Sequence, residues 1–547
     1  MNLLRNPLRL GLATLALLAP VALLAAEPKP VAVISMASVD ETLADVGYLT
    51  TVTGMEDAGK MVRLFGAALT SGMDKKRPAG AFVVPLAGEF PTVAFIPVTD
   101  LKQLLTIHKE YIGEPSDEGD GVQKVGLSRT AFIKEQNGWV FIAESKDHLV
   151  DLPADPSKLL GDLPTRYNLA GKVLVQNIPQ EFRQMVIDEI KFGLERGLDA
   201  PAIGRGDRDS IEQAARTSLA QIERYLNEAE EVSLGWAIDA PTRRTYIDIN
   251  VIAREGTALA KQMSQQTAMK SNFAGLKLPQ ASVTINIATK VAEADLAQIK
   301  GMIGGIREQL TRRIDDDPNL APDKRGVAKD ILGQLFDHLE KSWSSGVADG
   351  GAALVLEAES INLVAGGLSA DGKELEAILK KVADLAKNEP NFPAIQFNAG
   401  KHGNVDLHKL SAPIPAHEAE ARNFLGEKLD VVIGTGPKAV YLAAGKSGES
   451  LLKSALDRTP AAAETPIPPM QVEVALLPLL KFLSSVDDNP ELPEVIALLE
   501  QTGNDRLLIT SQPLPRGGQV RIELQEGLLR IIGKLVERFS GEFRDLL

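Results

Sequence analysis

The sequence predicts an α+β protein with two similar lobes, each a curved, mainly antiparallel sheet with helices packed on one face. Three observations predict it: strands with alternating apolar residues, helices with apolar residues every three or four positions, and one recurring order of elements. That order is a strand, one or two helices, a hairpin and a closing helix, which we call the β-α-α-ββ-α unit. It recurs four times, as expected of an internal repeat.

Two lobes are expected, with Gly275–Gln280 as the joint between them. Each lobe holds two units and an insertion between them. The first lobe spans 31–270, with units 31–112 and 172–270 and an inserted hairpin at 122–152; the second spans 281–545, with units 281–388 and 470–545 and inserted hairpins at 395–457. Chance similarity between common hairpin-helix motifs is the alternative explanation.

The clearest strand is expected over 246–251, where Ile247, Ile249 and Val251 alternate with polar residues. The same pattern returns over 520–525, and each strand follows a similar strand and precedes a helix. Because such strands have one apolar and one polar face, we expect the apolar face to pack on helices and the polar face to be partly solvated.

Residues 281–388 contain the fullest unit. A strand is expected at Val283–Ile287, and two apolar stripes at helical spacing follow it. A hairpin over 352–365 then leads to a helix, where Asp371 and Glu374 have the spacing of a capping box.

The matching unit 172–270 contains a strand at Val173–Gln176, and helices are expected over 180–197, 208–230 and 258–270. Unit 31–112 has hairpin strands over 80–86 and 92–98 before its closing helix.

The insertions also resemble each other. Strands are expected over 130–135 and 139–144 before Ser145, and over 430–434 and 439–444 before Ser447. Both serines are expected to cap the helix that follows.

Residues 1–26 have the features of an export signal. Charged, apolar and small residues follow one another: Arg5 and Arg9, then Leu10 to Leu24, then Ala25 and Ala26. A membrane anchor is the alternative, but the apolar run is short for about 30 Å of hydrocarbon, and Pro20 interrupts it. We expect cleavage, a periplasmic or extracellular location, and no transmembrane segment after cleavage.

The composition disfavours several function classes. The 547 residues include no cysteine, which excludes disulfides, thiol nucleophiles and cysteine-bound metal centres. The formal charge of −14 disfavours binding to nucleic acid, because a net negative field repels phosphate. Aromatic residues make up only 5% of the chain, which disfavours a platform for stacking bases.

A possible phosphate-binding loop ends in Gly445-Lys446-Ser447. Such a loop needs a first glycine five residues before its second one, and Val440 stands in that place within an expected strand. A helix cap at Ser447 explains the segment, and we reject nucleotide binding.

One segment contains potential zinc ligands: His402, Asp406 and His408, with His417 and Glu418 downstream. On an extended strand the first three share a face, and their side chains suit zinc. However, residues 401–404 are typical of a hairpin turn, which would separate His402 from the other two. Polar residues on a solvated strand are the favoured interpretation, and whether the three converge stays open. We assign no catalytic, cofactor-binding or metal-ligating residue and no cofactor.

The remaining candidates have structural interpretations. His108 follows an apolar helix face, which favours a packing role, and His148 and His338 fall on expected helices rich in charge. Neither a Gly-x-Ser-x-Gly elbow nor a His-Glu-x-x-His motif is present, so the common hydrolase and zinc-protease signatures are missing. The acidic runs 315–318 and 487–490 lack the ligand pattern of a calcium loop and are expected to end helices before proline.

Several stretches resemble secreted proteins of planctomycete-type bacteria that carry a domain of unknown function. These stretches are the signal peptide, Gly138–Ala143, Asn177–Pro179 and Phe273–Gly275. The resemblance covers most of the chain and implies export, but it brings no catalytic signature, cofactor or site residue. The paired lobes are also superficially similar to pitrilysin-like peptidases, of which only an inactive relative would lack the metal motif.

The favoured hypothesis is therefore a non-enzymatic binding or interaction protein of the bacterial envelope, whose exposed sheets contact an unknown envelope protein or ligand. A periplasmic carrier of an apolar, lipid-like ligand, held between sheet and helices, is the alternative. A hydrolase without a recognisable motif is the third hypothesis. The sequence does not predict the oligomeric state.

Overall fold

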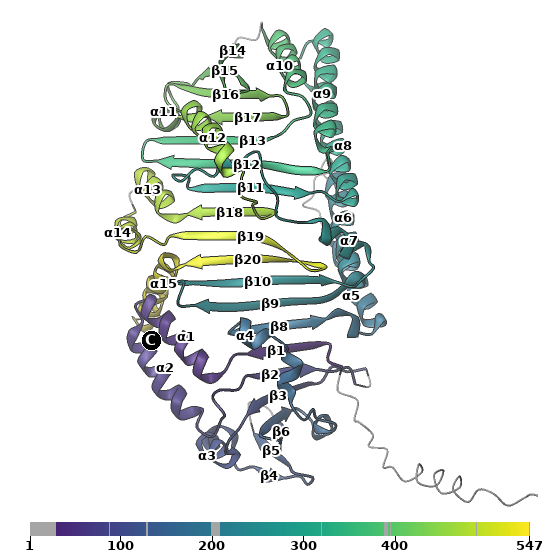
Figure 1. Ribbon diagram of the computed structural model, residues 1–547, viewed down its shortest axis with the longest axis vertical. Helices are drawn as coiled ribbons and strands as arrows, with labels where there is room; N and C mark the ends of the chain where they lie inside the picture. Colours follow the sequence, from purple (N-terminus) through teal and green to yellow (C-terminus); the bar gives the residue numbers. More distant parts are fainter. Residues whose placement is uncertain are drawn as a thin grey trace, which may run out of the picture.

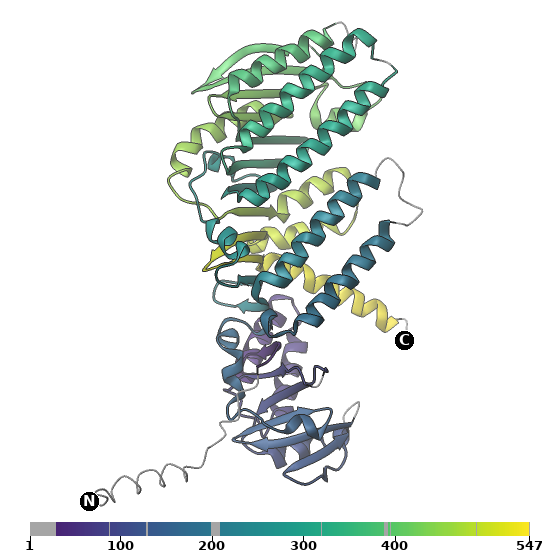
Figure 2. The ribbon, with the colours of Figure 1, turned by 90° about the vertical axis from the view of Figure 1, so that its right-hand side faces the viewer.

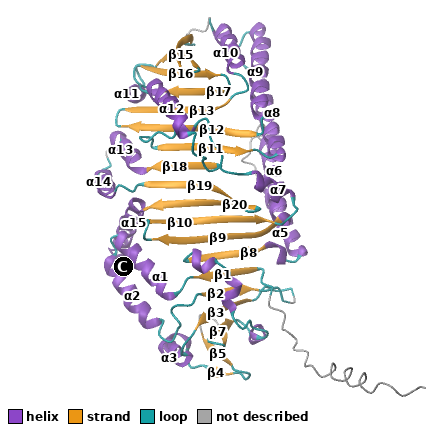
Figure 3. Cartoon of the chain, viewed as in Figure 1, coloured by secondary structure: helices purple, strands orange, loops and turns teal. Residues whose placement is uncertain are grey.

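A computed structural model describes residues 29–86, 88–126, 130–198, 208–318, 320–387, 392–393, 395–487 and 489–545. The α+β class is confirmed, and within these residues the strands form one antiparallel sheet of 20 strands. Figures 1 and 3 show the strands stacked along the long axis of the molecule, with helices at both ends of the strands. The predicted export signal, residues 1–26, lies outside the described residues.

The order of strands across the sheet follows from their pairing. From edge to edge, the described strands are β4 (Ser116–Asp117), β5 (Val122–Gly126), β6 (Thr130–Gln136), β7 (Trp139–Ala143), β3 (Thr92–Pro97), β2 (Ala79–Val83), β1 (Ala32–Met36), β8 (Leu169–Leu174), β9 (Ala229–Asp239), β10 (Arg244–Ala253), β20 (Gly517–Gln525), β19 (Arg506–Leu514), β18 (Met470–Ala475), β11 (Val283–Lys290), β12 (Val347–Glu357), β13 (Ser360–Leu368), β17 (Ala439–Ala444), β16 (Lys428–Gly436), β15 (Val405–Pro413) and β14 (Ile395–His402). Read inward from β4, the strands across the sheet are numbered 4-5-6-7-3-2-1-8-9-10. Read inward from β14, they are numbered 14-15-16-17-13-12-11-18-19-20, so each strand number is larger by ten.

Most of the helices form two rows, one at each end of the strands. The described α-helices are α1 (Val39–Val52), α2 (Glu56–Leu69), α3 (Leu101–Ile112), α4 (Leu163–Arg166), α5 (Gln180–Leu198), α6 (Arg208–Glu228), α7 (Ala258–Gln265), α8 (Glu293–Asp316), α9 (Pro322–Trp343), α10 (Gly372–Ala386), α11 (Ala419–Leu425), α12 (Gly448–Ala462), α13 (Leu476–Val486), α14 (Leu492–Thr502) and α15 (Glu526–Asp545). Short 3₁₀ helices are η1 (Lys146–Leu149), η2 (Pro156–Leu160), η3 (Val175–Asn177) and η4 (Ala274–Leu276). Figure 1 shows α5–α10 along one end of the strands and α1–α3 with α13–α15 along the other. In Figure 2 the long helices project to one side of the sheet. Within the described residues, no helix has the length and apolar content needed to cross a membrane.

The sheet has two faces of different character, because alternate residues of a strand point to opposite sides. We call the side that carries Phe95, Asp248 and Tyr441 the core face, and the other side the open face. The two largest hydrophobic clusters lie on the core face. One surrounds Phe95, and the other joins Tyr441 to Leu452 of α12.

Local sequence signals predict most elements correctly. The alternating segments around Ile247 and Ile522 are β10 and β20, and the segment around Ile285 is β11. Asp371 caps α10, accepting the Lys373 backbone N–H at 2.8 Å. The capping box is incomplete, since Glu374 instead forms an ion pair of 2.8 Å with Lys341.

Two expectations about the architecture are wrong. The strands form one sheet rather than one sheet per lobe, because β10 pairs with β20 from Arg244–Gln525 to Ile252–Gly517. Helices also do not cover a single side, since α12 packs on the core face whereas α9 lines a pocket on the open face. Helix position depends on long-range packing, which the order of elements does not specify.

Several element boundaries also differ from expectation. The strand expected over Val173–Gln176 ends at Leu174 and continues as η3, and the helix expected over 258–270 ends at Gln265. The insertion at 122–152 contains the three strands β5, β6 and β7 rather than one hairpin. The expected joint begins at Gly275, which is buried in η4 so tightly that an added Cβ would overlap the Ala455 carbonyl oxygen.

Candidate functional site

The open face is apolar across eleven consecutive strands, about 48 Å at about 4.8 Å per strand. Cross-strand register assigns it Ala32, Ile34 and Met36 of β1; Leu169, Gly171 and Val173 of β8; Glu230, Val232, Leu234, Trp236 and Ile238 of β9; Thr245, Ile247, Ile249 and Val251 of β10; Gly518, Val520, Ile522 and Leu524 of β20; Leu507, Ile509, Ser511 and Pro513 of β19; Met470, Val472 and Val474 of β18; Val283, Ile285, Ile287 and Thr289 of β11; Ala348, Gly350, Ala352 and Leu354 of β12; Ile361, Leu363, Ala365 and Gly367 of β13; and Val440, Leu442 and Ala444 of β17.

The polar groups of this face are few. Glu230 and Thr289 lie at strand ends, and Glu230 forms an ion pair of 2.9 Å with Arg516. Trp236 donates its indole N–H to Thr245 Oγ1 at 2.8 Å, and Ser511 adds a further hydroxyl to the face.

Large aliphatic side chains of the open face are exposed. The exposed fractions are 55% for Leu234, 49% for Ile34, 41% for Ile249, 41% for Ile285 and 37% for Ile287. Single exposed aliphatic residues are common on protein surfaces, but a contiguous patch marks a binding surface.

The polar residues of the same strands are buried on the core face, which contradicts the expected solvated polar face. Asp248 is 0% exposed, and Asn250, Thr284 and Asn286 are also buried. Alternation in a strand predicts that its two faces differ, but it does not determine which face the rest of the chain covers.

The buried Asp248 carboxylate is fully partnered. Arg521 Nε and Nη2 donate to its two oxygens at 2.8 Å each, from the directly opposite position on β20. Gln519 Nε2 and Tyr167 Oη donate to Oδ2 at 3.0 Å each. The Arg521 guanidinium also lies 3.8 Å from the Tyr246 ring centroid, and its hydrogen bonds to Asp248 raise its pKa. These contacts provide hydrogen-bond partners for the buried Asp248 carboxylate on the core face, where the two halves of the sheet meet.

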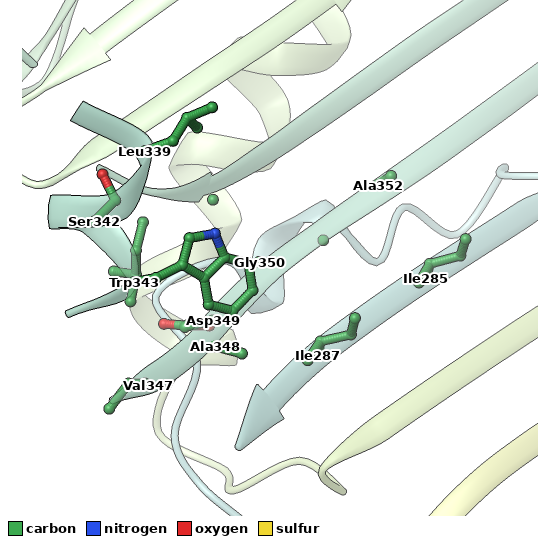
Figure 4. A pocket seen from close by; sticks show the side chains of 13 residues that line it. Ile285, Ile287, Leu339, Ser342, Trp343, Val347, Ala348, Asp349, Gly350 and Ala352 are labelled. Carbon is green, nitrogen blue, oxygen red and sulfur yellow. The ribbon is translucent and has the colours of Figure 1, made fainter. Parts of the chain in front are cut away.

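A pocket of about 390 Å³ lies on the open face beside α9. Ile285 and Ile287 of β11 and the glycines of β12 and β13 form one side, and Leu339 and Trp343 of α9 form the other. Figure 4 shows Trp343 extending from the helix toward β12 at Gly350.

The polar residues around this pocket bond to other protein groups. Asp349 accepts hydrogen bonds from Ser271 Oγ at 2.5 Å and from the Asn272 backbone N–H at 2.9 Å. Ser342 Oγ donates to the His338 carbonyl at 2.8 Å and accepts the Ala370 N–H at 2.9 Å. The pocket therefore offers mainly apolar surface to a ligand.

A second pocket, of about 480 Å³, lies between α3 and the strands β5 and β6. Charged side chains surround it, including Lys102 and Glu135, and Lys109 pairs with Glu114. Ligand pockets are usually apolar with few polar groups, so the pocket beside α9 fits that description better.

The structure does not gather the candidate zinc ligands. His402 Nε2 contacts Asp457 of α12 at 2.7 Å, and Asp406 pairs with Lys401 at 3.5 Å. His408 Nε2 contacts Thr435 Oγ1 at 2.9 Å, while its Nδ1 accepts the Asn398 N–H at 3.1 Å. The predicted turn is confirmed, since His402 pairs with Val405 across it. In the described part of the chain, no three histidine or carboxylate residues are grouped as metal ligands would be.

The other candidates have structural roles. His417 is exposed and Glu418 precedes α11, while Lys446 donates to the carbonyls of Glu359 and Asn423 at 2.7 and 2.6 Å. Ser447 precedes α12 as predicted, although its hydroxyl does not cap the helix. Ser145 accepts the Asp147 N–H at 3.3 Å, but it begins η1 rather than an α-helix.

The remaining histidines differ in burial. His108 Nε2 contacts the Leu69 carbonyl at 2.9 Å, and His148 lies in η1. His338 lies on α9 as expected, but it is buried and contacts Ser369.

The acidic runs end helices as predicted. α8 ends at Asp316 and α13 at Val486. Asp488 lies outside the described residues.

Sequence reasoning missed the pocket, whose members are apolar residues and glycines rather than chemically reactive groups. The available signal was the pair of double glycines, Gly350-Gly351 and Gly366-Gly367, at facing positions of one hairpin. Glycine inside a strand often marks close approach of another group.

His408 is expected to make folding stability depend on pH. Burial lowers the pKa of His408 below its ordinary value of 6.5, so the folded protein disfavours the imidazolium. The unfolded chain takes up that proton as pH falls through 6.5, and this contribution to stability is lost there and at lower pH. The free energy of unfolding, measured in urea, is expected to fall less between pH 7.5 and pH 5 in His408→Gln than in the wild type.

His417→Gln, at an exposed position, is the matched control and is expected to keep the wild-type dependence. Equal pH dependence in all three proteins would show that His408 does not contribute.

Comparisons with protein-family models, curated proteins and solved structures give no match.

Proposed function

We propose that this chain is a non-catalytic binding protein that carries the hydrocarbon chains of lipid-like ligands on its open face. One observation carries the proposal: Ile34, Leu234 and Ile249 are exposed, whereas the polar Asp248 and Asn250 on the other face of the sheet are buried. Fully burying an exposed aliphatic side chain contributes about 1.5–3 kcal/mol. These side chains are about half exposed, so an apolar ligand gains about half of that for each one it covers.

The chemistry of the open face favours hydrocarbon over a peptide. Its strands are hydrogen-bonded on both sides, so their backbone cannot pair with an added strand. A peptide carries polar groups at every residue, about every 3.4 Å, and would lose its hydrogen bonds to water on this surface. A hydrocarbon chain has no such groups to satisfy.

The surroundings of the open face disfavour a second sheet as the occupant. Two sheets pack face to face at about 10 Å, and a helix is itself about 10–12 Å across. The long helices project on one side of the sheet (Figure 2), and the residues that line the pocket place α9 on the open side. A flat partner would meet these helices first, whereas a narrow chain can lie between them.

We also infer that the two predicted lobes, 31–270 and 281–545, arose by duplication and that β10 and β20 join them into one carrying surface. The order of strands is the same when the sheet is read inward from either edge, which supports this inference. Arg243 and Arg516, both at φ 58°, also hold matching places in the turns before β10 and β20. Joining the halves doubles the length of the apolar surface.

The predicted export of the chain belongs to the same proposal. In the periplasm or outside the cell, a lipid chain that leaves a membrane needs an apolar cover against water. The carrier hypothesis is favoured over a general protein-interaction surface because the face offers few polar groups for specific contacts.

Lipid extraction of the native protein tests the proposal. We expect solvent extraction of protein purified without detergent to release an acyl-chain lipid, in at least about equimolar amount, on mass spectrometry. The delipidated full chain is then expected to bind radiolabelled oleate in equilibrium dialysis. Absence of both bound lipid and oleate binding would overturn the proposal.

A further inference from the structure

We propose that the pocket beside α9 binds the terminal segment of a linear acyl chain, and that Gly367 sets how far the chain enters. This inference rests on the proposed function and adds a defined subsite to it. Ile285 and Ile287 belong both to the open face and to the pocket, so a chain lying on the face can continue into the pocket.

The absence of a side chain at Gly367 is not explained by the fold. An added Cβ would meet only the Asp349 carbonyl oxygen, at 3.8 Å, and Gly367 is not among the residues with positive φ. Glycine within a strand costs about 0.5–1 kcal/mol relative to alanine. Its cross-strand partner Gly350 differs, because a Cβ there would lie 2.9 Å from the Gly366 carbonyl oxygen. Backbone packing therefore explains Gly350, whereas free space for a ligand explains Gly367.

The helical wall of the pocket is held in place by neighbouring groups. Ser342 bonds to the backbone of His338 and Ala370, and Lys341 pairs with Glu374 of α10. These contacts fix the helix end that carries Trp343. A preformed site loses less conformational freedom when a ligand binds, which favours affinity.

The pocket chemistry selects the end of a chain. The lining offers apolar side chains and glycines, and the carboxylate of Asp349 and the hydroxyl of Ser342 already bond to protein groups. A carboxylate or phosphate head group would gain no partner inside and would lose its hydration. The volume of about 390 Å³ lies in the range of small-ligand pockets, so it accommodates a chain segment rather than a protein domain.

Tryptophan fluorescence and dialysis of the delipidated full chain test the subsite. Of the three tryptophans, Trp139 is buried in the core cluster around Phe95, but Trp236 of β9 lies on the open face. All measurements therefore use a Trp236→Phe background, in which Trp343 reports on the pocket. Palmitate is expected to change the emission and to bind in dialysis. In Trp343→Phe, the emission change is expected to disappear while radiolabelled palmitate still binds.

Gly367→Val places three carbon atoms where the chain end would lie. We expect palmitate affinity to fall about tenfold or more, because a misfit of one methylene alone is worth about tenfold. The melting temperature is expected to stay equal or rise, since valine suits a strand. Gly400→Val is the control: Gly400 lies in β14, and an added Cβ would meet only Leu407 at an ordinary 3.9 Å. It is expected to leave palmitate affinity within about twofold.

The outcomes separate the subsite from the proposed function. Palmitate binding without any change in Trp343 emission, or with equal affinity in wild type and Gly367→Val, overturns the subsite while the carrier function stands. No binding of palmitate or of dipalmitoylphosphatidylglycerol overturns both. Binding of palmitate alone identifies a free fatty acid as the ligand. Binding of the phospholipid alone identifies the acyl chain of a lipid as the ligand. Either result supports the subsite if Gly367→Val weakens the binding.

Discussion

Asp248→Ala is expected to lower the free energy of unfolding by about 3 kcal/mol, measured by urea denaturation. Breaking a buried ion pair typically costs about 3–5 kcal/mol, because the remaining charge stays buried without its partner. Arg521 would stay beside Tyr246 without an acceptor for its two N–H groups. Tyr167 would also lose its acceptor, and Gln519 would keep only Asn250 Oδ1. The Arg521 side chain is 22% exposed, so water can partly replace the carboxylate, and we expect the lower end of that range.

A double-mutant cycle isolates the pair. Because either single variant already removes the interaction, Asp248→Ala with Arg521→Ala is expected to lose less than the sum of the two single losses, by at least about 1 kcal/mol. Asp337→Ala is the control, since Asp337 pairs with Arg307 at 2.8 Å with side chains 67% and 40% exposed. Exposed pairs contribute about 0–1 kcal/mol. Additive losses would contradict the coupling of Asp248 to Arg521.

The elements of the fold follow from local pattern, but their assembly does not. Ile247, Ile249 and Val251 define β10 because alternation is a property of the strand itself. The pairing of β10 with β20 joins residues such as Asp248 and Arg521, which are far apart in the sequence. Nothing local predicts this contact, so the sequence indicated separate sheets for the two halves.

Contacts between distant segments also explain why the polar face of the sheet is buried and its apolar face is exposed. A strand with isoleucine on one side and aspartate and asparagine on the other normally buries the isoleucines. Here Tyr167 and Arg521 supply the hydrogen bonds that let Asp248 be buried, and both come from distant segments. The exposure of Ile249 is a consequence of that arrangement, and it is visible only once the partners are in place.

The candidate site was also predictable from the sequence only in part. The turn at 401–404 was predictable from its residues, and it explains why His402 and His408 have different partners. The pocket depends on the placement of α9 against β12, which no motif encodes. Searches for reactive residue types therefore overlook a site built from Trp343 and Gly367.

Leu234→Asp is expected to abolish lipid carriage while leaving the lipid-free protein folded. Leu234 is 55% exposed on the open face and lies opposite Ile249 and Gly171. A short carboxylate there cannot reach away from the surface as a lysine would, so a bound chain would have to desolvate a charge. In the wild type, oleate at a hundredfold above its Kd is expected to add about 2.7 kcal/mol to the free energy of unfolding. In Leu234→Asp, oleate is expected to add almost nothing.

Two controls make this result specific to the open face. Val150→Asp adds the same charge at a residue that is 64% exposed but lies outside the open face, and it is expected to keep oleate binding. Leu234→Val keeps an apolar side chain and is also expected to bind. Because Leu234 is exposed, the aspartate should change the stability of the lipid-free protein by no more than about 1 kcal/mol, mainly through its poor fit to a strand. If Leu234→Asp binds oleate as tightly as Val150→Asp, the hydrocarbon chain does not lie on this face, and the exposed isoleucines need another explanation.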